Sequence, residues 1–193
     1  MTTRVPRVIR LLRTDETVLA GVLADLVNGA YTFAQTEIFV RATPRTSAVM
    51  MSTLIADGGV LVAQHGEDVV GLVHVRDLED RRGFFGMLAV APSVRSVGVA
   101  RDLLDEVEAR GDARGLTAME LDLLMPDPPT AHQSRLREWY ERRGYLPVAS
   151  RSFSEIEPDL AAHLRHPTAL IRYAKRLTPA PSPDRPLRAS PAQ

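Results

Sequence analysis

The sequence predicts an α+β (mixed α/β) fold, with one domain built around a single central sheet. Segments with apolar side chains at helical spacing are interspersed with segments at strand spacing, in the order β-α-α-β-β-β-α-β-α-β-β. Three strand segments follow one another in the middle of the chain, which is typical of hairpins rather than of repeated βαβ units. The chain has 193 residues, enough for one domain with a sizeable core.

The first third of the chain predicts one strand followed by two helices. Residues 5–13 form the strand, while residues 16–31 and 45–57 carry apolar side chains every three or four positions, as amphipathic helices do. Residues that favour helix N-caps precede both helices, namely Thr14 or Asp15 for the first and Thr46 or Ser47 for the second.

The middle of the chain predicts a hairpin and a further strand. Residues 60–64 and 69–78 are rich in valine and leucine, and a polar turn at residues 65–68 joins them. A third apolar run, residues 83–92, ends at Pro92, which cannot continue a central strand.

The remaining elements are two helices and three strands. Residues 98–114 and 132–144 have helical spacing, and Gly144 is placed to end the second helix. The expected strands are residues 116–125, 145–153 and 168–177. The sequence therefore predicts a domain over residues 1–177. Residues 178–193 are rich in proline and small polar side chains, and we expect them to be a disordered tail.

Composition excludes several classes of protein. Lys+Arg and Asp+Glu both number 24, and this zero net charge weighs against a nucleic-acid-binding protein. The chain has no cysteine, which excludes disulfides, thiolate metal sites and cysteine nucleophiles. His163 and His166 have a spacing that metal ligands can adopt, but no carboxylate cluster accompanies them, so we expect no metal site. The chain lacks both a signal peptide and the ~20 consecutive apolar residues that span a membrane, so the prediction is a cytoplasmic protein without membrane association.

Small residues at the start of the helix at 98–114 indicate an anion site. Gly98 and Ala100 follow a strand and a short loop that carries Arg95. The first N–H groups of a helix have no partner within the helix and lie at the positive end of its dipole. Small side chains let a phosphate group approach these amides closely. The alternative is that Gly98 and Ala100 serve only to pack the helix against the sheet.

Two motifs resemble those of the GNAT superfamily of N-acetyltransferases. Arg95-Ser96-Val97-Gly98-Val99-Ala100 is similar to its motif A, Arg/Gln-x-x-Gly-x-Gly/Ala. The segment "LREWYERRGYLPV" resembles its motif B, in which a tyrosine precedes Gly-Tyr or Gly-Phe by a few residues. The resemblance covers roughly residues 5–177 and implies a central mixed, twisted sheet of six to seven strands flanked by helices.

The resemblance implies acetyl-CoA as cosubstrate, with its diphosphate on the amides of the helix start and its pantetheine arm along the strand "MLAV". It assigns cofactor binding to Leu88, Ala89, Val90, Arg95, Ser96, Val97, Gly98, Val99, Ala100, Arg101, Gln133 and Ser134. Two of these depart from the family pattern: Ser96 stands where glycine is usual, and Gln133 stands where asparagine is frequent.

Acyl transfer to an amine requires a proton acceptor for the amine, polarisation of the thioester carbonyl and a proton donor for the departing thiolate. Tyr140 matches the motif B tyrosine and is the expected acid, with aromatic packing as the alternative role. The backbone N–H of Val90 or a neighbour is the expected donor to the carbonyl. Some relatives carry a glutamate base early in the motif A strand, but residues 83–86 of this chain contain no carboxylate.

The base must therefore come from elsewhere in the chain. Asp122 is the expected base or amine anchor, and Glu120, Asp77 and Glu79 are further candidates. Glu120 and Asp122 lie on one face of a strand. The alternative is that this face opens to a cleft or is paired with arginine.

Three functions fit these residues. The first is an N-acetyltransferase acting on a small-molecule amine or on a peptide or protein amine, and residues 31–57 are expected to shape its acceptor pocket. The second is a non-catalytic relative that binds or senses acyl-CoA. The third, a toxin that acetylates charged tRNA, needs a strongly basic surface. The sequence does not identify the acceptor, and it leaves a homodimer open.

Overall fold

In the computed structural model, residues 7–41, 44–94 and 98–177 are described, so Arg95, Ser96, Val97 and the predicted tail at 178–193 lie outside the described residues. The strands are β1 (Arg7–Leu11), β2 (Val60–His65), β3 (Asp68–Asp77), β4 (Arg82–Val90), β5 (Ala118–Pro126), β6 (Leu146–Ser152) and β7 (Thr168–Arg176). The α-helices are α1 (Ala20–Ile38), α2 (Ala48–Ala56), α3 (Val99–Ala113), α4 (Ala131–Arg142), α5 (Phe153–Ile156) and α6 (Pro158–Ala161). The predicted order of elements is confirmed, with α5 and α6 as additions between the last two strands.

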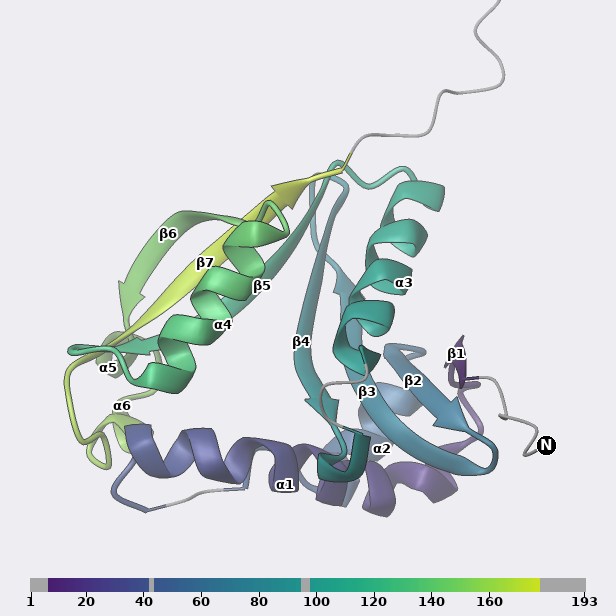
Figure 1. Ribbon diagram of the computed structural model, residues 1–193, viewed down its shortest axis with the longest axis horizontal. Helices are drawn as coiled ribbons and strands as arrows, with labels where there is room; N and C mark the ends of the chain where they lie inside the picture. The colour runs from purple at the N-terminus through teal and green to yellow at the C-terminus, as the bar shows by residue number, and fades with distance from the viewer. Residues whose placement is uncertain (1–6, 42–43, 95–97, 178–193) are drawn as a thin grey trace, which may run out of the picture.

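The described strands form one seven-stranded sheet in the order β1-β2-β3-β4-β5-β7-β6. The β4–β5 pair is parallel, and the other neighbouring pairs are antiparallel. This confirms the predicted α+β fold with one mixed central sheet. Figure 1 shows that the sheet has two halves, which meet where β4 and β5 pair and spread apart toward α1.

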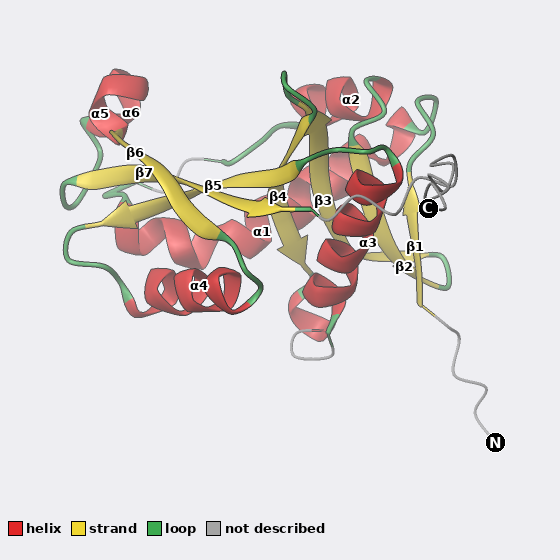
Figure 2. Ribbon diagram, turned by 90° about the horizontal axis from the view of Figure 1, so that it is seen from above, coloured by secondary structure: helices red, strands yellow, loops and turns green. Residues whose placement is uncertain are grey.

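The helices cover the sheet from both sides. Figure 2 shows α3 and α4 on one side of the sheet, and α2, α5 and α6 on the other. On the α3 side, Leu103 and Leu104 pack with Phe85 and Tyr145 in the largest apolar cluster. A second cluster joins α1 and α2 to the sheet, and Leu23, Val27, Met51, Ile55 and Leu72 belong to it. Burial of these side chains is the main source of stability.

The structure corrects two details of the first helix. Neither Thr14 nor Asp15 caps it: Asp15 pairs with Arg13, and a single 3-10 turn, η1 (Thr17–Leu19), leads into α1. The helix also continues to Ile38, so residues 31–38 are helical rather than part of the connecting segment. For α2 the predicted cap is confirmed as Ser47, whose hydroxyl accepts a hydrogen bond from the Met50 N–H at 3.2 Å.

No helix among the described residues is long and apolar enough to cross a membrane.

Candidate active site

The central feature of the candidate site is the separation of β4 from β5. The two strands pair only at Arg82–Ala118, Gly83–Met119 and Phe84–Glu120, at the start of both strands. Beyond Phe84, β4 contains an extra residue relative to β3, and Met87 has a φ of 51°. A bulge of this kind bends a strand. The bend accompanies the divergence of the two halves of the sheet in Figure 1.

Leu88, Ala89 and Val90 lie in the part of β4 that has left β5. On the opposite edge, Ala89 is paired with Leu72 and Val90 with Gly71 of β3. Among the described strands, none pairs with the other edge of this segment. Its outward backbone N–H and C=O groups are therefore available to an extended ligand.

A pocket of about 390 Å³ lies at the start of α3, next to this strand edge. Gly98 is the N-cap residue of α3 and has a φ of 85°, a conformation that favours glycine. The pocket is lined by Val90, Val94, Gly98, Val99, Ala100, Arg101 and Trp139. Five of these residues, namely Val90, Gly98, Val99, Ala100 and Arg101, belong to the cofactor-binding set that the family resemblance implied. Trp139 was not predicted, although its position next to Tyr140 is a signal that could have suggested it.

Charged side chains surround this helix start. Arg101 is exposed and lies 3.6 Å from the Asp102 carboxylate, which also pairs with Arg7. Asp102 is therefore shared by two arginines, and the guanidinium of Arg101 stays at the pocket wall, where an anionic ligand can contact it.

Gln133 is buried in the first turn of α4, with 4% of its surface exposed. Its Nε2 donates a hydrogen bond to the Leu124 carbonyl of β5 at 2.9 Å. Its Oε1 is buried and has no hydrogen-bond partner among the described residues. A buried acceptor without a partner costs free energy, so this atom is suited to a ligand N–H. The neighbouring Ser134 is half-buried, and its backbone N–H continues the helix by donating to Thr130.

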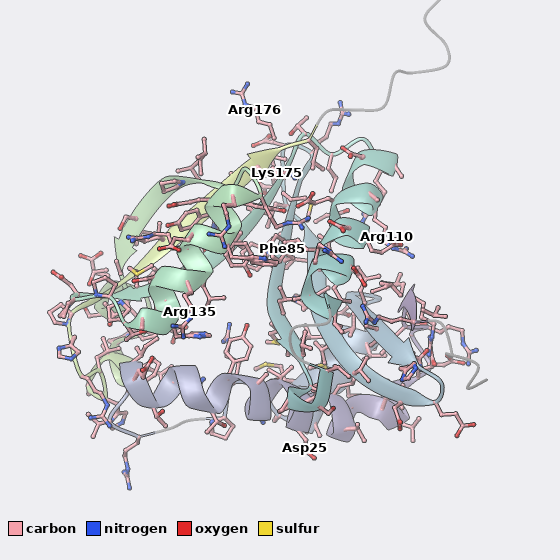
Figure 3. The ribbon with its side chains drawn as sticks, in the orientation of Figure 1. Asp25, Phe85, Arg110, Arg135, Lys175 and Arg176 are labelled. Atoms are coloured by element: carbon pink, nitrogen blue, oxygen red, sulfur yellow. The ribbon has the colours of Figure 1, made fainter. Side chains whose placement is uncertain are left out.

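Tyr140 lies on the buried side of α4, with 6% of its surface exposed. Its ring contacts Trp139, Tyr145 and Phe85, at centroid distances of 4.8, 5.9 and 6.1 Å. Phe85 is labelled in Figure 3 between α3 and α4. Burial is the main cause that raises the pKa of Tyr140 above its ordinary value of 10, and the nearby Tyr31 acts in the same direction. The phenol is therefore protonated at neutral pH, as a proton donor must be.

Tyr31 is a residue that the sequence analysis did not single out. It projects from α1 and packs against the α1–α2 apolar cluster, close enough to Tyr140 for the two phenols to interact electrostatically. Burial raises the pKa of Tyr31, and the Arg45 guanidinium acts in the opposite direction. The helix α1 thus brings a second hydroxyl toward the predicted acid.

Asp122 and Glu120, the two carboxylates proposed for β5, form an ion-pair network. Asp122 accepts hydrogen bonds from Nε and from one terminal nitrogen of Arg172, the latter at 2.9 Å. Glu120 is 4% exposed and accepts from Arg172 and Arg82, both at 2.7 Å. The alternative of arginine pairing is therefore confirmed. All four carboxylate oxygens have partners, and a proton accepted by Asp122 would neutralise the charge that binds Arg172.

The remaining candidate bases are also poorly placed. Asp77 is paired with Arg114, and Glu79 is exposed at the end of the hairpin. His74 is half-buried, and its ring lies against Gly59. Burial is the main cause that lowers the pKa of His74, with Arg76 adding to it.

Over the described residues, no group of three or more histidine, aspartate or glutamate side chains could hold a metal ion.

The family model described as "Acetyltransferase (GNAT) family" matches residues 23–145. The chain belongs to the GNAT acetyltransferase family. The matched residues make up more than half of the chain and include β4 and β5, the start of α3 and Tyr140.

Solved structures of GNAT proteins share the fold at low sequence identity. A GNAT-family protein of Desulfovibrio desulfuricans is 20% identical, with 90% of this chain and 100% of that chain covered and a TM-score of 0.64. A Salmonella typhimurium protein with acetyl-CoA bound is 14% identical, with coverages of 92% and 98% and a TM-score of 0.61. N-acetylglutamate synthase of Neisseria gonorrhoeae, complexed with coenzyme A and N-acetyl-glutamate, is 14% identical, with coverages of 90% and 35% and a TM-score of 0.60. No curated protein sequence matches the chain.

Proposed function

We propose that this GNAT protein is an N-acetyltransferase that transfers an acetyl group from acetyl-CoA to an amine. The observation that carries the proposal is the separation of β4 from β5 directly beside the pocket at the start of α3. This arrangement offers a strand edge, a helix N-terminus and a buried phenol to one elongated ligand. The GNAT structures from Salmonella and Neisseria contain acetyl-CoA or coenzyme A, which supports this choice of ligand.

The residues present fit the cosubstrate. We assign the diphosphate to the amides at the start of α3, where Gly98 and Ala100 leave room and Arg101 adds positive charge. We assign the pantetheine arm to the free edge of Leu88, Ala89 and Val90. Its amide N–H groups are suited to the buried Gln133 Oε1, which accepts no hydrogen bond from the described residues. We also assign cofactor binding to Arg95, Ser96 and Val97, because they belong to the family's motif A. Ser134 is included because it stands beside Gln133.

Bound acetyl-CoA supplies a thioester. The acceptor nitrogen uses its lone pair to form a bond to the thioester carbonyl carbon, and the carbon–sulfur bond breaks. We assign the donor to the carbonyl oxygen, on which negative charge develops, to a backbone N–H on the free edge of β4 between Val90, which lines the diphosphate pocket, and the bulge at Met87. The Tyr140 hydroxyl gives its proton to the departing sulfur and regains a proton from solvent.

The amine must also lose a proton. Because Asp122 is held by Arg172, we assign this proton to water rather than to Asp122, which departs from the role expected from the sequence. In this proposal the role of Asp122 and Glu120 is structural: both join β5 to β7 through Arg172. Glu120 also joins β5 to β4 through Arg82, next to the point where β4 and β5 separate.

Two measurements test the proposal. Calorimetry should show that the chain binds coenzyme A, and a thiol-release assay with acetyl-CoA and a broad amine library should show turnover. Absence of coenzyme A binding would contradict the proposed function. Binding without turnover of any amine would support the non-catalytic alternative, an acyl-CoA-binding relative.

A further inference from the structure

The side of the sheet opposite α3 and α4 carries a group of charged side chains beside the strand separation. Arg76, Phe84 and Glu120 are in register on three adjacent strands and therefore share a face. Asp122, two residues after Glu120, and Arg172, its partner on β7, lie on the same face. Phe84 and Glu120 are the last pair before β4 leaves β5, so this group borders the place where we propose acyl transfer.

The negative charges of this group are already neutralised. Arg172 and Arg82 together satisfy all four oxygens of Asp122 and Glu120. An acceptor that depended on a carboxylate to bind a second positive charge would have to displace a guanidinium from a largely buried ion pair. Displacing it would leave an uncompensated buried charge, which is costly. This face therefore disfavours polycationic acceptors.

The positive charge of Arg76 is not neutralised. Its guanidinium lies 4.7 Å from the centre of the Phe84 ring, and the Arg172 guanidinium lies 5.2 Å from the same centre. Within the described part of the chain, no carboxylate lies within 4.0 Å of Arg76 and none of its N–H groups has an acceptor. Stacking on Phe84 orients the guanidinium but leaves the donors at its edge available.

A second unneutralised arginine lies on the segment between α1 and α2, which Figure 2 shows on this same side of the sheet. The Asn28 side-chain amide donates to the Thr46 carbonyl at 3.0 Å and accepts from the Thr46 N–H at 3.1 Å. Thr46 is buried, so the neighbouring Arg45 is anchored to α1. Asn28 and Tyr31 are three residues apart on α1 and share a face, which brings Arg45 toward Tyr31. No ion pair joins Arg45 to another described residue.

We propose that the acceptor is a small amine that carries a carboxylate, such as an amino acid, and that Arg76 binds this carboxylate on the side of the sheet opposite α3 and α4, with Arg45 as a second candidate. The inference rests on the proposed acetyl transfer. It follows from the sign of the charges in this group: the carboxylates of Asp122 and Glu120 are paired, whereas the Arg76 guanidinium has no ion pair to another described residue. A guanidinium offers two parallel donors that match the two oxygens of a carboxylate.

The test compares acceptors that differ only in the carboxylate. L-Phenylalanine, L-tryptophan, L-histidine and L-arginine would be assayed beside their carboxamides and their decarboxylated amines, with kcat/KM corrected for the fraction of unprotonated amine. We expect the corrected kcat/KM of the amino acids to exceed that of the carboxamides and of the decarboxylated amines by about 10- to 100-fold, because a hydrogen bond between charged groups contributes that much to binding. Equal or better use of the carboxamides and amines would overturn the inference.

Variants assign the preference to residues. Arg76→Gln should remove most of the preference for the amino acid through KM, while the affinity for coenzyme A and the rate with a decarboxylated amine stay unchanged. Arg45→Gln tests the second arginine in the same assay. Arg176→Gln is the matched control, since Arg176 is exposed at the end of the strands far from α1 (Figure 3) and its loss changes the net charge equally. A preference that survives Arg76→Gln and Arg45→Gln would overturn the assignment.

Coenzyme A binding separates this inference from the proposed function. A chain that does not bind coenzyme A would contradict both. A chain that binds it and acetylates only amines without a carboxylate, or none of the panel, would overturn the acceptor inference and leave the cofactor proposal standing.

Discussion

Tyr140 and Tyr145 are packed edge to face in one aromatic cluster, with ring centroids 5.9 Å apart and planes at 78°, but only one of the two hydroxyls is satisfied. The Tyr145 hydroxyl donates to Glu108 Oε1 at 3.1 Å, and its residue is fully buried. The Tyr140 hydroxyl has no hydrogen bond to any described residue. The Tyr145 phenol is therefore structural, whereas the Tyr140 phenol is available to a ligand.

Tyr140→Phe should lower kcat by about 10²–10⁴-fold, the usual range for loss of an acid catalyst, while the affinity for coenzyme A stays nearly unchanged. Tyr145→Phe is the control within the same cluster. It should cost about 1 kcal/mol of stability through the lost hydrogen bond to Glu108 and leave kcat unchanged. Steady-state kinetics and thermal unfolding of both variants measure these effects. Wild-type turnover in Tyr140→Phe would return Tyr140 to a packing role.

The pH dependence of kcat gives a second test of the same assignment. Burial raises the pKa of Tyr140 above 10, so its protonated form persists well into the alkaline range. We expect no loss of kcat from this group between pH 7 and pH 9. A rise in kcat across that range that disappears in Tyr140→Phe would show that the hydroxyl acts in its ionised form, contrary to the proposal.

Gly98 and Gly144 offer a matched pair for testing the anion site. Both have left-handed backbones, with φ of 85° and 88°, and each lies next to a helix end. Alanine at either position should cost about 1–2 kcal/mol of stability because of its Cβ. Only Gly98→Ala should also weaken coenzyme A binding, by about tenfold or more, because Gly98 lines the pocket. Calorimetry that finds equal affinity in the two variants would exclude a role for the start of α3 in binding.

The order of strands and helices could be predicted from the sequence because it depends on local periodicity and on end signals such as Ser47 and Gly144. The role of Gly98 could be predicted for the same reason, since a small residue at a helix start has a local physical meaning. The helices α5 and α6 could not, because each is a single turn without a pattern of its own: α5 is held by contacts to β6 and β7, and α6 packs against α5.

The state of Asp122 could not be predicted because it depends on a residue far away in the chain. Arg172 lies opposite Asp122 only through the antiparallel register of β5 and β7. A strand pattern indicates which face a carboxylate occupies, but not which side chain the neighbouring strand places beside it. Tyr31 was overlooked for a similar reason: only the packing of α1 below the separated strands brings it toward Tyr140.

Removal of residues 178–193 should leave the domain intact, which tests the predicted boundary at residue 177. The Leu177 N–H donates to the Thr117 carbonyl at 3.0 Å, and its side chain is buried beside Gly111. A chain that ends at Leu177 should keep its melting temperature and its affinity for coenzyme A. A chain that ends at Arg176 loses a buried leucine and should be less stable by about 2–3 kcal/mol. A clear loss of either property in the longer truncation product would place part of the tail in the fold or the site.

Glu16 should contribute to stability in a pH-dependent way. Hydrogen bonds from Arg10, at 2.7 and 2.8 Å, are the main cause that lowers the pKa of Glu16 to about 2. Because the folded-state pKa is lowered, this contribution is complete above the unfolded pKa of about 4.5 and is lost as the pH falls toward 2. Glu16→Gln should therefore lower the melting temperature by about 2–4 °C at pH 7, and the difference from wild type should shrink below pH 4.5. The exposed neighbour pair Asp15–Arg13 provides the control, since Asp15→Asn should have little effect at any pH.

Substitution of Asp122 distinguishes a base from a structural ion pair. If Asp122 took the proton of the amine, Asp122→Asn would lower kcat by about 10²-fold or more and remove the acid limb of the pH–rate profile. We expect instead a decrease of less than about tenfold and an unchanged pH profile, with a stability loss of about 1–3 kcal/mol because Arg172 loses a charged partner. Glu120→Gln is the comparison, since Glu120 binds the same arginine from a more buried position, so its stability loss should be at least as large. Kinetics across pH 5–9 with both variants measures the difference. A large loss of kcat confined to Asp122→Asn, together with the loss of the acid limb, would restore Asp122 as the base and would require its ion pair with Arg172 to open during turnover.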